Sequence, residues 1–126
     1  MILVLDDSVE RLKKFISNIP SAKTAETADE MIELIKNNSP VDFLFLDHDL
    51  GGETYVDSKE HNTGMEVVRW IVANKPSIQK IVVHTCNTDA GFEMEDKLIA
   101  AGYDTGYVPY VNIRWEGMEK LLGTVI

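Results

Sequence analysis

Five ionisable side chains directly follow two short apolar segments of this sequence: Asp6, Asp7, Asp47, His48 and Asp49. Carboxylates crowded into one place repel one another unless some stay protonated or a cation lies between them. Hard divalent ions such as Mg²⁺ and Mn²⁺ prefer the oxygen ligands that aspartates supply. Provided that the fold brings the two segments together, we predict a divalent-metal site with Asp6, Asp7 and Asp47 as ligands and Asp49 as a fourth member.

These residues also have ordinary structural interpretations. Asp6 and Asp7 could simply cap the helix that follows them. His48 could be a metal ligand, a general acid or base, or a turn residue. His84 ends another apolar segment, where the structural alternative to a functional histidine is a buried, neutral one bonded to the backbone.

Weaker candidates lie nearby in the sequence. Thr85 and Asn87 could donate hydrogen bonds to a phosphate, although both are also common in turns. His61 lies in a polar segment, which is more typical of an exposed side chain. Cys86 has no obvious activating neighbour in the sequence and is more typical of inert packing.

The elements that must position these residues alternate between strand and helix. Short apolar runs predict strands over residues 2–5, 21–25, 42–46, 80–84 and 106–110. Helical spacing of apolar residues predicts helices over residues 9–18, 26–38, 65–74, 88–101 and 114–122. Ser8 is the expected cap of the first helix, and Thr88 or Asp89 that of the fourth.

This alternation indicates parallel crossover units in a doubly wound α/β sheet. We predict a flavodoxin-like fold, with five parallel strands in the order 2-1-3-4-5 flanked by about five helices. The first and third strands are neighbours in that order. Asp6, Asp7, Asp47 and Asp49 would then share one edge of the sheet, with His84 and Thr85 beside them.

Composition sets limits on the class of protein. The 126 residues suit a single domain spanning residues 1–126, and the hydrophobic fraction of 44% is that of an ordinary globular chain. A net charge of -9 argues against an extended nucleic-acid surface but allows a small phosphate ligand bridged by a metal. One cysteine, no membrane-length apolar run and no signal-peptide features lead us to expect a cytoplasmic protein.

Across almost its whole length the sequence resembles the receiver domain of response regulators. The similar positions are the Asp6-Asp7 pair, Asp47, Thr85, residues 63–68 and residues 107–110. The resemblance implies that Asp47 corresponds to the phosphoacceptor. Three features depart from the receiver pattern. Val108 stands where a receiver has its lysine, the stretch from Asp47 to Gly64 is longer, and His48, Asp49 and His84 are foreign to ordinary receivers.

These departures resemble a narrower family, the cyclic-phosphate processing receiver-like domains. The similar features are the two aspartates with Arg11 downstream, LDHDLG at residues 46–51, Thr63-Gly64, and a His-hydroxyl-x-Asn segment at residues 84–87. Cys86 departs from this pattern, because similar sequences often have an aromatic residue there. The resemblance implies action on cyclic phosphates in phage and bacterial RNA-repair or conflict settings.

The leading hypothesis is a metal-dependent phosphoesterase that opens a cyclic phosphate of a nucleotide, a cyclic-nucleotide signal or an RNA end. Mg²⁺ or Mn²⁺ would polarise the phosphoryl group and activate a water molecule. His48 and His84 would share the general base and acid roles. The residues expected to hold the phosphate are Thr85, Asn87 and Arg11.

Other functions remain open at this point. A divergent receiver without catalytic activity could bind a metal, a phosphate ligand or a protein partner as a signalling module. Asp47 could also form a covalent phospho-aspartate during hydrolysis. An ordinary receiver is the third alternative, although the missing lysine argues against a conventional phosphorylation switch.

Overall fold

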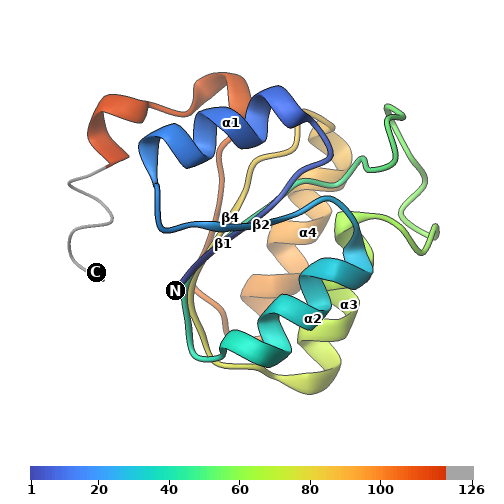
Figure 1. The fold of residues 1–126 in the computed structure, drawn as a ribbon. Helices are drawn as coiled ribbons and strands as arrows, with labels where there is room; N and C mark the ends of the chain where they lie inside the picture. Colours follow the sequence, from blue (N-terminus) through green and yellow to red (C-terminus); the bar gives the residue numbers. More distant parts are fainter. Residues whose placement is uncertain (119–126) are drawn as a thin grey trace.

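Five parallel strands form a single sheet in the computed structural model, which describes residues 1–118 (Figure 1). The strands are β1 (Ile2–Leu5), β2 (Lys23–Ala25), β3 (Val41–Leu46), β4 (Ile78–Val83) and β5 (Thr105–Tyr107). The helices are α1 (Val9–Asn18), α2 (Ala28–Asn38), α3 (Gly64–Asn74) and α4 (Thr88–Ala100). The strand order is β2-β1-β3-β4-β5, so the predicted flavodoxin-like fold and strand order are confirmed.

Alternating side chains of the strands supply two separate hydrophobic cores. In β3, Leu44 and Leu46 pack into the core on one face of the sheet, whereas Phe43 and Phe45 pack into the other. Figure 1 shows α2, α3 and α4 on one side of the sheet, with α1 and the C-terminal turns on the other. Because both faces are covered, the central strands are apolar at nearly every position.

Four polar side chains cap the α-helices by accepting a backbone hydrogen bond in the first turn: Ser8, Thr27, Thr63 and Asn87. Ser8 is the cap that the sequence predicts for α1, so neither Asp6 nor Asp7 fills that position. Asn87 caps α4 in place of the predicted Thr88 or Asp89, because α4 already begins at Thr88. The Asn87 side chain therefore has a structural task in addition to any role in binding.

The first residues of the predicted fifth helix differ from the structure. After β5 the chain forms two 3-10 turns, Tyr110–Asn112 and Trp115–Gly117, and of residues 114–118 only Met118 is α-helical. Residues 119–122 of that prediction lie outside the described residues. No helix in the described part of the chain is long and apolar enough to cross a membrane.

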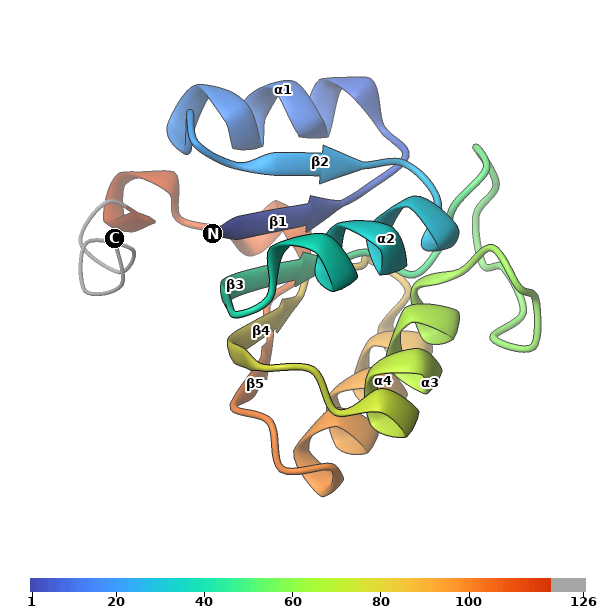
Figure 2. The same cartoon turned by 60° about the horizontal axis from the view of Figure 1, so that its bottom comes forward.

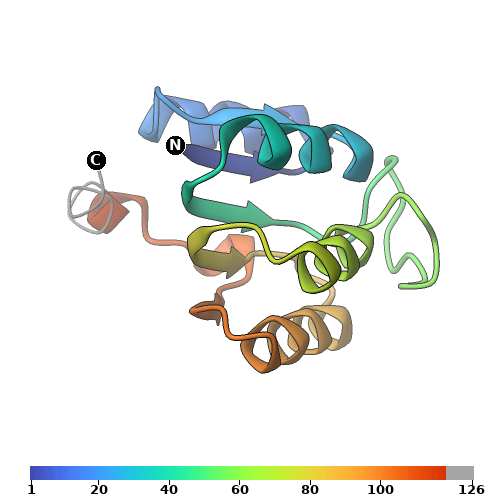
Figure 3. The same cartoon turned by 90° about the horizontal axis from the view of Figure 1, so that it is seen from below.

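A long connection between β3 and α3, residues 51–62, extends beyond the carboxyl ends of the strands. In Figures 2 and 3 it is the green loop at the end of the sheet toward which the strand arrows point. An isolated bridge between Asp49 and Thr63 closes the base of this loop. The loop therefore stands beside the edge where ligands bind in open α/β sheets.

Candidate functional site

Strand register places three ionisable side chains next to one another at the carboxyl edge of the sheet. Leu5 pairs with Leu46, and Leu46 pairs with Val83. The residues that follow these three are therefore neighbours: Asp6, Asp47 and His84. Ligand atoms from all three lie within 4.8 Å of one another, and all three side chains are buried.

Asp47 is the carboxyl group whose proton affinity this environment changes most clearly. Its pKa lies at about 6, above the ordinary 3.8, and the largest cause is burial, because desolvation penalises the charged form. The charge of Asp6 raises this pKa further, whereas the charge of His84 lowers it. Hydrogen bonds from the His48 backbone and the Thr85 side chain also lower it.

The buried cluster is consistent with a receiver-type divalent-metal site. Asp6 and Asp47 offer carboxylate oxygens, the ligand type that Mg²⁺ and Mn²⁺ prefer. Arg11 is the cation near them, but its Nη1 atom lies 3.9 Å from Asp6 Oδ2, at the limit of an ion pair. A divalent cation would offset the cost of ionising both carboxylates, so the residues present fit such an ion.

Two predicted metal ligands lie outside this close cluster. Asp7 Oδ2 accepts a hydrogen bond of 2.6 Å from the backbone N–H of Gly52. Asp49 accepts backbone hydrogen bonds from Tyr55 at 2.8 Å and from Val56 at 3.1 Å. Both carboxylates thus hold the 51–62 loop, and their role as metal ligands stays a prediction.

His48 is fully buried, and both of its ring nitrogens are engaged. Nδ1 lies 2.7 Å from Asp49 Oδ1, and Nε2 lies 2.9 Å from Ser58 Oγ. An ionised carboxylate can only accept, so Nδ1 donates to Asp49, and the Ser58 hydroxyl is the hydrogen-bond partner of Nε2. Burial raises the pKa of Asp49, but hydrogen bonds from His48, Asn87 and the loop backbone outweigh burial and lower that pKa below its ordinary value.

His84 is also fully buried, with its ring packed against Phe15 at 5.2 Å between centroids. Nε2 lies 2.9 Å from Asp6 Oδ2, so the ring donates to a carboxylate of the cluster. Nδ1 has no hydrogen-bond partner within the described part of the chain. Neither His84 nor His48 lines the cavity at this edge, and direct proton transfer by either ring stays a prediction.

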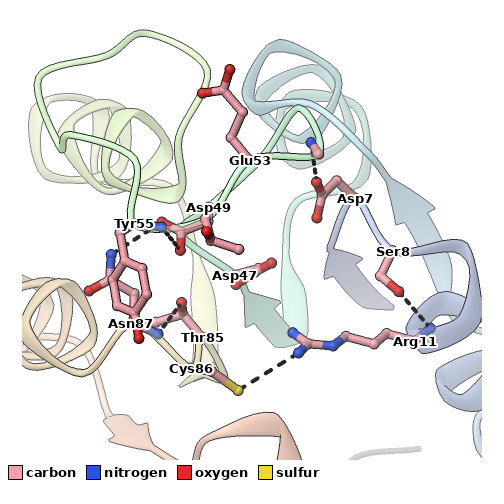
Figure 4. A pocket seen from close by; sticks show the side chains of 12 residues that line it. Asp7, Ser8, Arg11, Asp47, Asp49, Glu53, Tyr55, Thr85, Cys86 and Asn87 are labelled. Atoms are coloured by element: carbon pink, nitrogen blue, oxygen red, sulfur yellow. Dashed lines mark hydrogen bonds between the residues drawn. The ribbon is translucent and has the colours of Figure 1, made fainter.

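The cavity has a volume of about 410 Å³ and opens above Asp47 (Figure 4). Figure 4 shows the Asp47 side chain between Asp49 on one side and Arg11 on the other. Six of the predicted site residues line it: Asp7, Arg11, Asp47, Asp49, Thr85 and Asn87. The structure therefore brings the predicted phosphate-binding residues to one cavity with three of the predicted metal ligands.

Arg11 approaches the cavity from the first turns of α1. Its guanidinium lies over the Tyr110 ring, 4.6 Å from the centroid, and Nη2 lies 3.8 Å from Cys86 Sγ. Stacking on an aromatic face fixes the plane of a guanidinium while leaving its edge free for an anion. Arg11 is thus held in a fixed plane at the cavity, where its role in binding a phosphate stays a prediction, and Cys86 forms part of the cavity wall beside it.

Gly64 allows α3 to begin directly against Asp47. A Cβ atom at this position would lie 1.8 Å from the Asp47 carbonyl oxygen, a distance that no side chain can adopt. The backbone N–H of Gly64 also donates to the His48 carbonyl at 2.9 Å. The Thr63-Gly64 pair therefore combines a helix cap with a close backbone approach that positions the site.

Two loop residues that contact the site, Ser58 and Tyr55, could not be recognised from the sequence. Both lie in a polar stretch without periodicity, which does not predict the path of the loop. His61 proves exposed and lies apart from the cavity, where it contacts Asp29 at 2.7 Å and Glu66 at 3.6 Å. It ties the end of the loop to α2 and α3 and does not line the cavity.

A sequence profile of the cyclic-phosphate processing receiver domain matches residues 1–100. The chain belongs to this family. The profile covers the whole sheet except β5, together with every residue of the cavity and of the buried cluster. No curated protein matches the sequence.

Solved structures place the chain among receiver folds. The N-terminal domain of a response regulator/sensory box/GGDEF protein from Carboxydothermus hydrogenoformans matches with a TM-score of 0.65 at 16% identity, over 98% of this chain and 90% of that one. The BeF3-activated DrrB receiver domain matches with a TM-score of 0.64 at 22% identity, over 98% and 93%. A response regulator from Colwellia psychrerythraea gives 0.62 at 16% identity, over 98% and 94%. Likeness at these identities shows the fold.

Proposed function

We propose that this domain hydrolyses a cyclic phosphate in a metal-dependent reaction, with a nucleotide or RNA-end 2′,3′-cyclic phosphate or a cyclic-nucleotide signal as substrate. The observation that carries the proposal is the buried Asp6, Asp47 and His84 cluster beneath a cavity of about 410 Å³, in a domain of the cyclic-phosphate processing family. An acidic cluster alone would repel a phosphate, so the cation is an essential part of the proposal.

Asp6 and Asp47 would hold Mg²⁺ or Mn²⁺, with Asp7 and Asp49 as the further ligands that the sequence predicts. The bound ion would supply Lewis-acid polarisation of the phosphoryl group and a water molecule of lowered pKa. His84 Nε2–H, 2.9 Å from Asp6 Oδ2, orients that carboxylate, in the way that outer hydrogen bonds orient metal ligands elsewhere.

The polar groups of the cavity wall would hold the phosphate. Arg11 brings a fixed positive charge, which suits phosphate oxygens better than a mobile lysine would. Thr85 and Asn87 add hydrogen-bonding groups at the amino end of α4, where the helix dipole also favours an anion.

Hydrolysis also needs a group that takes a proton from water and a group that gives one to the departing ribose oxygen. The sequence assigns these roles to His48 and His84. Because neither ring lines the cavity, His48 would act through Asp49, which does line it, and His84 would act by holding the Asp6 carboxylate that binds the ion. A phospho-aspartate at Asp47, which does line the cavity, is a variant of the same reaction.

Turnover assays with purified protein, Mn²⁺ and a panel of 2′,3′- and 3′,5′-cyclic nucleotides test this proposal. We expect a phosphomonoester product from at least one substrate and no product with EDTA. Asp47→Asn and His84→Asn should reduce turnover at least about 100-fold, the loss typical of general-acid or electrostatic groups. Asp104→Asn is the matched control, because Asp104 is an exposed aspartate at the start of β5 on the opposite edge of the sheet.

One observation favours a second function, a binding module without catalysis. Both histidines are fully buried, and neither ring lines the cavity, as expected of structural residues. Such a module would bind a cyclic nucleotide in a metal-dependent manner, measurable by calorimetry, without forming product. Labelling of Asp47 by acetyl phosphate would instead indicate an ordinary receiver.

A further inference from the structure

The 51–62 loop carries one large aromatic side chain that the reaction proposed above does not use. Tyr55 is 79% exposed, yet it lines the cavity. Its backbone φ is 53°, in the left-handed region that bulky residues rarely adopt. An exposed aromatic ring on a strained backbone points to a role in binding, since neither feature contributes to the core.

The site itself fixes the position of this residue. The N–H of Tyr55 donates to Asp49 Oδ2 at 2.8 Å, and the next N–H, that of Val56, donates to Asp49 Oδ1 at 3.1 Å. Asp49 in turn accepts from His48 at 2.7 Å and from Asn87 at 3.2 Å. The backbone that carries the ring is thus bonded directly to the Asp49 carboxylate and, through it, linked to the Asn87 amide of the cavity wall.

The rest of the loop is also held in place. Ser58 contacts the buried His48 ring at 2.9 Å, and its carbonyl accepts from Arg69 Nη1 at 2.6 Å. Arg69 Nη2 donates to the Glu60 carbonyl at 3.2 Å. These contacts order the loop before any ligand arrives, which reduces the entropy lost when the ring engages one.

Figure 4 shows the Tyr55 ring on the side of the cavity where Asn87 and Thr85 lie, with Arg11 on the opposite side and Asp47 between them. A ligand whose phosphate meets Asp47 and Arg11 would therefore have room to place a planar group against Tyr55. The cavity volume of about 410 Å³ is within the range of cavities that hold a drug-sized ligand. This volume exceeds what a cyclic phosphate alone requires.

We propose that Tyr55 is the stacking platform for the nucleobase of that substrate and lets the site distinguish a base-bearing cyclic phosphate from a base-free sugar or polyol cyclic phosphate. This inference rests on the proposed function and specifies its substrate. Every base has a π-face, so stacking tolerates any base, and we expect little discrimination among the four. Replacing a stacking aromatic with alanine weakens nucleotide binding by about 5- to 150-fold in general.

The test compares adenosine 2′,3′-cyclic phosphate with glycerol 1,2-cyclic phosphate, which has no base. Binding in the presence of Mn²⁺ is measured by calorimetry, and product formation is measured separately, for the wild type, Tyr55→Ala and Tyr55→Phe. We expect the wild type to prefer the nucleotide by about 5- to 150-fold. Tyr55→Ala should lose that preference while binding the glycerol compound as the wild type does, and Tyr55→Phe should keep it.

The outcomes separate the two proposals. If the wild type and Tyr55→Ala bind and hydrolyse both compounds equally well, the stacking role is refuted and the phosphoesterase stands. If the wild type binds the nucleotide preferentially through Tyr55 but forms no product, the stacking role stands and the phosphoesterase is refuted. If the wild type binds neither compound, the stacking role is refuted, and so is the phosphoesterase for 2′,3′-cyclic phosphates.

Discussion

Replacing Asp47 with asparagine is expected to stabilise the metal-free protein at neutral pH, although the same change should abolish its function. The Asp47 carboxyl binds its proton more tightly in the folded state, where its pKa is about 6, than in the unfolded chain, where its pKa has the ordinary value of 3.8. The folded state is therefore penalised whenever this group must be ionised. The free energy of unfolding should fall as the pH rises from about 4 to about 6 and should level off above that.

The size of the effect follows from the two pKa values. A tenfold change in proton affinity corresponds to about 1.4 kcal/mol, so the shift from 3.8 to about 6 corresponds to about 3 kcal/mol. Asparagine keeps an oxygen that can accept from the His48 backbone, as Oδ1 of Asp47 does at 2.8 Å. We therefore expect Asp47→Asn to gain about 1 to 3 kcal/mol at pH 8 and almost nothing at pH 4.

Urea denaturation of both proteins in EDTA, followed across this pH range, provides the measurement. Asp104→Asn serves as the control, because its exposed carboxylate near Lys80 should change stability by less than about 0.5 kcal/mol. Adding Mn²⁺ at pH 8 should stabilise the wild type far more than Asp47→Asn. Equal stability of wild type and variant at pH 8 would refute the argument that the ionised, buried Asp47 destabilises the folded state and that a bound metal offsets this destabilisation.

Three further predictions concern the surroundings of the site. Gly64→Ala should destabilise the protein by at least about 3 kcal/mol in urea denaturation, because its Cβ would meet a backbone oxygen at 1.8 Å. Gly106→Ala is the control, because a Cβ there meets nothing within 4 Å, and equal losses of stability in the two variants would contradict the reasoning. The pKa of His61, followed by NMR, should lie above its ordinary value of 6.5 because its ring bonds to Asp29, and Asp29→Asn should lower that pKa. A His61 pKa that is the same in wild type and Asp29→Asn would show that this contact is absent in solution. Tyr55→Gly should relieve the left-handed strain at φ 53°, so that thermal unfolding shows an unchanged stability or a gain of about 0.5 to 1 kcal/mol, while nucleotide binding weakens. A marked loss of stability would show that the ring is structural.

The fold and the central cluster could be predicted from the sequence for one physical reason. Parallel strands in the order 2-1-3-4-5 place the residues after β1, β3 and β4 side by side, and apolar runs locate those strand ends well. Asp6, Asp47 and His84 therefore meet as a consequence of register. The prediction needed no knowledge of side-chain orientation.

The orientation of the side chains at the site could not be predicted from the sequence. Asp7 and Asp49 lie at the predicted edge, but their oxygens accept hydrogen bonds from the 51–62 loop, whose path has no periodicity to predict it. The direction of the His48 ring depends on Ser58, ten residues later. The cap of α4 was misassigned because Asn87 can serve as both a cap and a binding group, and composition does not distinguish these roles.

Hydrolysis of adenosine 2′,3′-cyclic phosphate followed by ³¹P NMR in the presence of Mn²⁺ tests the central claim most directly. We predict that the cyclic phosphate signal is replaced by that of a phosphomonoester for the wild type and the Asp104→Asn control, and that it persists with EDTA or with Asp47→Asn. A cyclic phosphate signal that persists with the wild-type protein and Mn²⁺, while calorimetry shows that the nucleotide is bound, would contradict the phosphoesterase and establish a binding module.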